Sequence, residues 1–159
     1  MNLTTTSLHA CLQEEVKAMT SLAELLKMEQ TVLVSGKVEE LTQLTLNKTR
    51  LIGDISELEK SRNRHLLSLG YSADAAGVQA WLGQVPADSE TGQCWTALLQ
   101  VTAAANQDNR TNGILINKHM NNTQSALKIL QQNDPAGSFY GPSGLATVGK
   151  VTGRGFAAR

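Results

Sequence analysis

The fold is decided by residues 95–130, which read WTALLQVTAAANQDNRTNGILINKHMNNTQSALKIL. Spacings of three and four residues connect a series of apolar or small side chains: Trp95, Leu98, Thr102, Ala105, Ile116, Ala126 and Leu130. The seam positions between them are polar: Asn109, Asn112, His119 and Thr123. Such spacing is typical of a coiled-coil helix. We expect this helix to pack against others, although its middle is too polar for a dry core.

Two helices of similar length are expected before this stretch. Residues 5–34 carry a seam at Leu8, Leu12, Glu15, Met19, Leu22, Leu26, Glu29 and Leu33. Residues 37–69 carry one at Leu41, Leu44, Lys48, Leu51, Ile55, Leu58, Arg62, His65 and Leu69, which Ile52 and Leu66 widen. Only Ser35 and Gly36 separate them, and a short connection places helices side by side. An antiparallel hairpin is therefore predicted, with one continuous helix kinked at Gly36 as the alternative.

A short helix is expected to connect the hairpin to the long helix. It falls within residues 71–89, where Ser72 can serve as N-cap and Trp81 is expected to close the end of the bundle. Asp88 or Ser89 can cap the long helix, which an Asp-Pro pair ends at about residue 132. The predicted fold is all-α: an elongated antiparallel three-helix coiled-coil bundle with a short connecting helix and a flexible C-terminal tail.

The C-terminal residues differ in composition from the rest of the chain. Six glycines and three basic residues lie beyond Ala136, with no acidic residue and too few large apolar side chains for a core. Phe139, Tyr140 and Leu145 are closely spaced hydrophobic residues in this segment, which resembles a short linear binding motif. Two domains are predicted: a helical bundle, 1–133, and a Gly-rich, largely disordered tail with a short binding motif, 134–159.

The overall composition argues against several classes of protein. The 159 residues include 14 basic and 14 acidic side chains, which argues against nucleic-acid or anionic-membrane binding. No apolar window is long enough for membrane insertion and no signal peptide is visible, so a cytoplasmic location is expected. Cys11 and Cys94 stand alone and are read as small buried hydrophobic residues, although a disulfide between them remains an alternative.

No motif in the sequence argues for catalysis, a cofactor or a metal. None of His9, His65 and His119 belongs to a ligand pair such as HExxH. A histidine phosphotransfer domain that uses His65 or His119 is a minor alternative, and the family pattern HxLKG is absent around His65. No nucleophile has a plausible base beside it in the sequence. A non-enzymatic protein is therefore expected.

Apolar side chains beyond Asn112 exceed what one seam requires. Ile116, Met120, Leu127 and Leu130 suit the intramolecular seam, whereas Leu115, Ala126 and Ile129 form a second, displaced stripe. A helix with two stripes has one available for a partner. The first two helices or a dimer mate could equally cover both stripes.

The run NQDNRTNGILINKHMNNTQSALKIL, followed by YGPSG, is similar to the FlgN family of flagellar type III export chaperones. The matching residues are Asn109, Asn112, Gly113, Leu115, Leu127, Leu130, Tyr140, Gly141 and Gly144. The motif covers about the last third of the chain, and the upstream helices resemble the family in length and layout. The polar Thr123 and His119 depart from an ideal apolar groove, which leaves open the face that meets cargo.

The resemblance implies a function that the spacing does not. FlgN-like proteins bind the hook-filament junction proteins FlgK and FlgL in the cytoplasm, prevent their premature assembly and deliver them to the export gate protein FlhA. Carried over by position, the expected contacts with the C-terminal helical segments of this cargo are Asn112, Gly113, Leu115, Ile116, Met120, Leu127 and Leu130. The expected export-gate contacts are Tyr140, Gly141 and Gly144. A structural coiled-coil dimer or adaptor without an export role is the alternative, and the free chaperone is also compatible with a homodimer.

Overall fold

The computed structural model describes residues 3–133, with side chains from Leu8 onward. Its elements follow in the order α1 (Leu3–Ser35), the 3-10 turn η1 (Val38–Glu40), α2 (Leu41–Ser68), α3 (Ala75–Leu82) and α4 (Glu90–Gln132). These described residues form an all-α fold without strands, as predicted. The chain divides into two compact units, Met1–Asn117 and Lys118–Arg159. The predicted boundary after residue 133 stays a prediction, because 134–159 lie outside the described residues.

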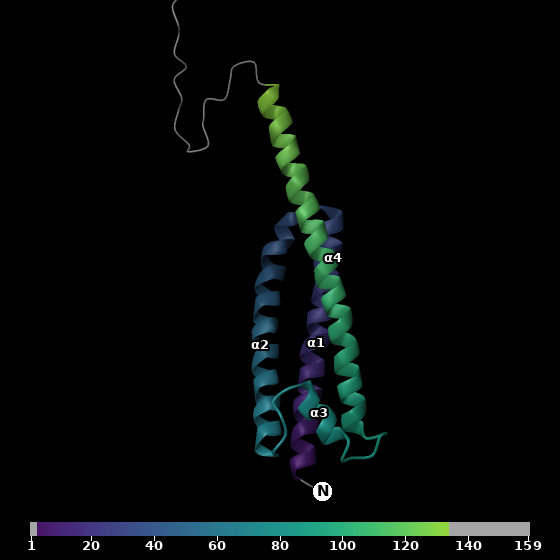
Figure 1. Cartoon of the computed structure of the whole chain (residues 1–159). Coiled ribbons are helices and arrows are strands. Elements are labelled where there is room, and N and C mark those ends of the chain that lie inside the picture. Colours follow the sequence, from purple (N-terminus) through teal and green to yellow (C-terminus); the bar gives the residue numbers. More distant parts are fainter. Residues whose placement is uncertain (1–2, 134–159) are drawn as a thin grey trace, which may run out of the picture. The chain divides into compact units, whose positions relative to one another are not determined.

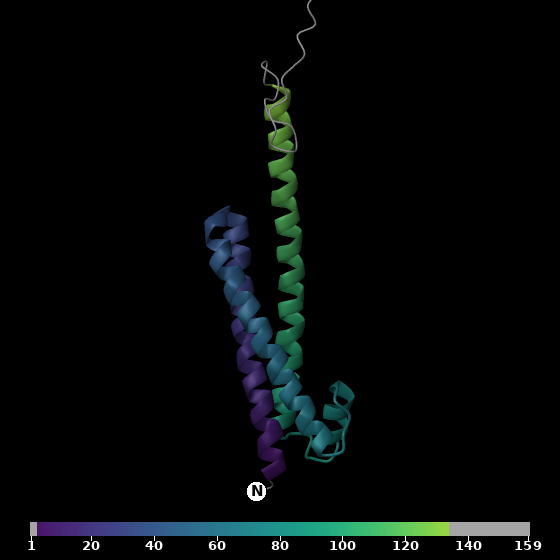
Figure 2. The same ribbon diagram turned by 90° about the vertical axis from the view of Figure 1, so that its left-hand side faces the viewer.

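The first two helices form the predicted antiparallel hairpin and lie side by side (Figures 1 and 2). Gly36 has a φ of 76°, a left-handed conformation that glycine adopts without steric cost. Its N–H donates to the carbonyl oxygen of Val32 at 3.0 Å, which ends α1. The chain therefore reverses at Gly36, and the alternative of one continuous kinked helix is wrong.

The predicted seam of α1 is the centre of the bundle. Seven of its eight positions are buried, namely Leu8, Leu12, Glu15, Leu22, Leu26, Glu29 and Leu33, and Met19 is half-buried. The seam of α2 is covered less completely, because only Arg62 is buried along it, together with Leu66 beside it. The seam of α4 is buried at Trp95, Leu98, Ala105 and Asn112. The spacing thus predicts the inward face of α1 and of the first part of α4. Beyond Asn112 the expectation of an intramolecular seam is wrong, because its apolar residues are exposed: Ile116, Met120, Leu127 and Leu130.

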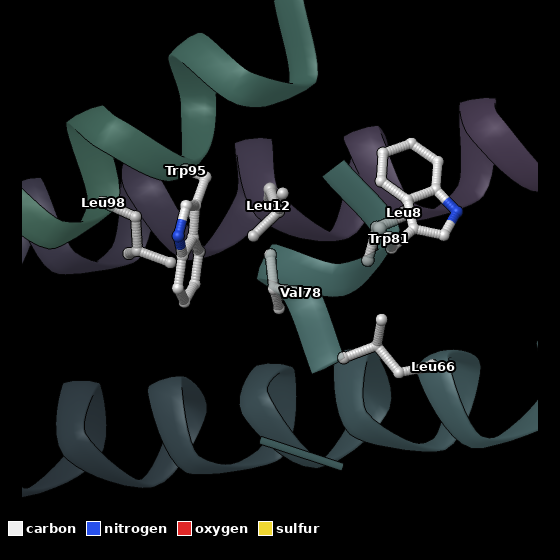
Figure 3. Close-up of a cluster of buried hydrophobic side chains, with 7 residues drawn as sticks. All are labelled: Leu8, Leu12, Leu66, Val78, Trp81, Trp95 and Leu98. Carbon is white, nitrogen blue, oxygen red and sulfur yellow. The ribbon is translucent and has the colours of Figure 1, made fainter. Parts of the chain in front are cut away.

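One end of the bundle is closed by an apolar cluster to which four helices contribute (Figure 3). Its buried members are Leu8 and Leu12 of α1, Leu66 of α2, Val78 and Trp81 of α3, and Trp95 and Leu98 of α4. Trp81 is only 7% exposed, which confirms its predicted place at the end of the bundle. Burying each of these large side chains contributes about 1.5–3 kcal/mol, so the short α3 is held mainly by this cluster.

The N-cap of α3 is Asp74, and the expectation that Ser72 caps this helix is wrong. Asp74 has extended backbone angles, and its carboxylate oxygen Oδ1 accepts from the N–H of Gly77 at 2.9 Å. The hydroxyl of Ser72 instead donates to the same carboxylate at 2.7 Å. Ser89 caps α4, because its Oγ accepts from the N–H of Gly92 at 3.2 Å, which decides between the two predicted caps.

Candidate functional site

A buried polar layer closes the bundle around Asn112. The side chain of Asn112 is fully buried, and its Nδ2 donates to Oε1 of Glu29 and to the carbonyl oxygen of Leu26, both at 2.9 Å. The ammonium of Lys48 lies 3.2 Å from the same Glu29 oxygen. We call Asn112, Glu29 and Lys48 the Asn112 layer. Because an unpaired buried charge or amide is costly, these contacts favour one register of α1, α2 and α4. The amide oxygen Oδ1 of Asn112 is buried without a hydrogen-bond partner among the described residues.

A second buried polar layer consists of Glu15, Arg62 and Trp95, which we call the Glu15 layer. Nη1 of Arg62 donates to Oε2 of Glu15 at 2.6 Å, and the guanidinium carbon lies 5.6 Å from the centre of the Trp95 ring. Burial raises the pKa of Glu15 to about 7, although the Arg62 charge opposes this shift. The two layers explain why glutamates occupy the α1 seam, because each glutamate is paired with a basic residue of α2: Glu15 with Arg62, and Glu29 with Lys48.

The described part of α4 beyond Asn112 exposes large apolar side chains. In the first unit, Ile114 is 64% and Ile116 is 38% exposed. In the second unit, four apolar side chains are more than half exposed: Met120, Leu127, Ile129 and Leu130. Helical hydrogen bonding continues there to the N–H of Asn133, which donates to Ile129. Several exposed apolar side chains on one helical segment are typical of a protein-binding surface.

The predicted cargo-binding residues separate into two groups. Asn112 belongs to the bundle interior, so the free protein does not present it to a partner. Gly113, Ile116, Met120, Leu127 and Leu130 are exposed, and Leu115 is half-buried. The predicted gate residues Tyr140, Gly141 and Gly144 lie outside the described residues.

A further apolar patch near the hairpin turn was not predicted from the sequence. Met28, Val34 and Val38 are more than half exposed there. A pocket of about 540 Å³ lies between Val32 of α1 and Leu44 of α2. The sequence could have indicated this patch, because Met28, Val34 and Val38 are apolar residues that fall outside the heptad seams.

The histidines and cysteines have ordinary surroundings. His65 and His119 are half-buried, and Nδ1 of His9 lies 3.3 Å from the hydroxyl of Thr91. Within residues 3–133, no group of three or more His, Cys, Asp or Glu side chains could hold a metal ion. Cys11 and Cys94 are free and half-buried, and burial raises the pKa of both thiols.

The fold places the chain in the class of small helical-bundle proteins. The family model described as "FlgN protein" matches residues 1–147 of the chain. Two relatives from Yersinia enterocolitica, one of them from serotype O:8 / biotype 1B, are each 26% identical over 145 residues. The match covers 90% of this chain and 91% of each relative, and both are named "Flagella synthesis protein FlgN". The chain belongs to the FlgN family.

Two further findings concern solved structures and membrane-spanning helices. No solved structure matches the chain at a significant level. None of the helices within residues 3–133 is both long enough and apolar enough to cross a bilayer.

Proposed function

We propose that this protein is a non-enzymatic, cytoplasmic export chaperone of the flagellum. It binds the junction proteins FlgK and FlgL, prevents their premature assembly and delivers them to the export gate protein FlhA. The proposal is supported by membership of the FlgN family and by relatives named for flagella synthesis. The observation that carries it is the exposed apolar surface of α4 beyond Asn112.

We assign the cargo contact to exposed residues of α4. These residues are Met120, Leu127 and Leu130 of the second unit. An amphipathic helix of the cargo can bury its apolar face against such side chains. Each fully buried leucine or methionine contributes about 1.5–3 kcal/mol, from which the cost of ordering the cargo segment is subtracted. Moderate affinity results, which permits release at the export gate.

The gate contact remains assigned to the tail. Tyr140, Gly141 and Gly144 belong to the segment that resembles the family motif. Because this segment is separate from the cargo residues in the sequence, cargo and FlhA can be bound at the same time. The proposed sequence of events is capture of the cargo by α4, followed by contact of Tyr140 with FlhA.

A binding measurement with the C-terminal helical segment of FlgK tests the cargo surface. We expect the wild-type chain to bind this segment and Leu127→Asp to bind it at least tenfold more weakly. The physical reason is that the variant loses the burial of one leucine and places a charge in an apolar contact. Isothermal titration calorimetry measures both affinities, and circular dichroism checks that the helices are retained.

Ser125→Asp is the matched control. It adds the same charge two residues away, on the opposite side of the helix, and is expected to bind like the wild type. Equal affinities of wild type and Leu127→Asp would place the cargo surface elsewhere. Failure of the wild-type chain to bind FlgK or FlgL would overturn the proposed function.

The structural dimer is the second candidate, because the same exposed apolar residues could be covered by another copy. It predicts a dimer whose mass does not change with protein concentration. Light scattering of the full chain, with and without FlgK, distinguishes the candidates: a chaperone forms a complex with cargo, whereas a purely structural dimer keeps its mass.

A further inference from the structure

A groove runs between α2 and α4, which lie on either side of α1 (Figure 1). One section is a pocket of about 430 Å³ lined by Ile52 of α2 and Asn106 of α4. The next section, of about 340 Å³, is lined by Arg62 of α2 and Thr102 of α4. Met19 of α1 lines both sections, so the two sections adjoin each other along α1. We call it the α2–α4 groove.

The walls of this groove are apolar and incompletely covered. Ile52 on α2 is 50% exposed and Leu99 on α4 is 47% exposed. Leu51 and Ile55, which belong to the predicted seam of α2, are only half-buried. A heptad seam in a complete bundle is covered by its neighbours. The partial burial of α2 therefore leaves room for one more helix.

The charged side chains in the groove already have partners within the bundle. Lys48 is paired with Glu29, and Arg62 is paired with Glu15 and also lies 3.6 Å from Glu59. A charged partner face would leave a buried charge without compensation, which is strongly unfavourable. The groove therefore fits a partner face that is apolar and uncharged.

Two polar atoms in the Glu15 layer are buried below the surface of the groove. Oε1 of Glu15 and Nε1 of Trp95 have no hydrogen-bond partner among the described residues. Both side chains line the groove and are more than nine-tenths buried. Both atoms have almost no accessible surface, so an occupant of the groove does not need to supply a hydrogen bond to either of them.

A second copy of the chain does not fit this groove by simple face-to-face pairing. Two identical grooves related by a twofold axis are both concave, so neither fills the other. The occupant must be convex, and an α-helix with an apolar stripe has that shape.

We propose that the α2–α4 groove receives one amphipathic helix of the cargo and thereby becomes a four-helix bundle. The cargo helix carries an apolar heptad stripe with uncharged flanks. The identity of the occupant as cargo rests on the proposed function. The groove itself is a site additional to the exposed residues around Leu127.

Binding of full-length FlgK to groove variants of the full chain tests this inference. Ile52→Glu and Leu99→Glu each place a charge in the groove at a residue that is about half exposed in the free protein. We expect each to weaken FlgK binding at least tenfold. Leu46→Glu is the matched control, because Leu46 is exposed on α2 and lines neither section of the groove. It is expected to bind FlgK like the wild type.

Methyl NMR of the wild-type chain gives a second measurement that requires no substitution. Addition of FlgK should shift the methyl signals of Ile52 and Ile55 and leave those of Leu46 unchanged. The groove site would be overturned if the methyl signals of Ile52 and Ile55 do not change on addition of FlgK. It would also be overturned if the groove variants bind FlgK normally while Leu127→Asp binds it weakly. Either result leaves the proposed function intact. A wild-type chain that binds neither FlgK nor FlgL would overturn the function itself. Shifts of Ile52 that depend on protein concentration without cargo would identify a second copy as the occupant and overturn the proposal.

Discussion

Replacement of Asn112 by alanine tests whether the Asn112 layer holds the bundle together. The substitution removes two hydrogen bonds of 2.9 Å, one to the carbonyl oxygen of Leu26 and one to the carboxylate of Glu29. A neutral hydrogen bond contributes about 1 kcal/mol and one to a charged group about 1.5–3 kcal/mol. The higher helix propensity of alanine offsets roughly 0.6 kcal/mol of this loss. We expect the free energy of unfolding to fall by about 2–3 kcal/mol.

Urea unfolding followed by circular dichroism measures this loss. Asn109→Ala is the matched control, because Asn109 is an exposed asparagine on the same helix. We expect the control to raise the free energy of unfolding by roughly 0.6 kcal/mol, which is the gain in helix propensity alone. A double-mutant cycle with Glu29→Gln should give a coupling energy of about 1 kcal/mol or more. If Asn112→Ala is as stable as Asn109→Ala, the reasoning about the Asn112 layer is refuted.

Two further predictions concern the Glu15 layer and the cap of α3. Burial raises the pKa of Glu15 to about 7. Between about pH 4.5 and 7 the folded state therefore binds more protons than the unfolded state. The stability that protonated Glu15 contributes is lost as the pH rises through this range. Urea midpoints of the wild type should therefore fall more steeply between pH 5 and pH 8 than those of Glu15→Gln, and parallel pH profiles would contradict the assignment. Asp74→Ala should lower the temperature of thermal unfolding, because the N–H of Gly77 loses its acceptor. Ser72→Ala should cost less, since Ser72 only donates to the Asp74 carboxylate; an equal or larger loss from Ser72→Ala would contradict the cap assignment.

The heptad spacing predicted the three long helices and the buried faces of α1 and of the first part of α4. The α1 seam was identified with glutamates included, because periodicity depends on position rather than on residue type. The turn at Gly36 also followed from the sequence, since glycine adopts left-handed backbone angles readily. The sequence also showed more apolar residues beyond Asn112 than one seam requires. The structure exposes four of their side chains: Ile116, Met120, Leu127 and Leu130.

Only the tertiary structure decided which neighbours cover each face. From the sequence, Asn112 was predicted to interrupt the apolar seam and to contact cargo. In the structure it donates a hydrogen bond to Glu29 inside the bundle, and Glu29 lies 83 residues earlier in the chain. The half-covered seam of α2 has the same spacing as the buried seam of α1, so the α2–α4 groove could not be found from periodicity. A repeat identifies the inward side of a helix, whereas the presence or absence of a neighbour depends on packing between segments far apart in the sequence.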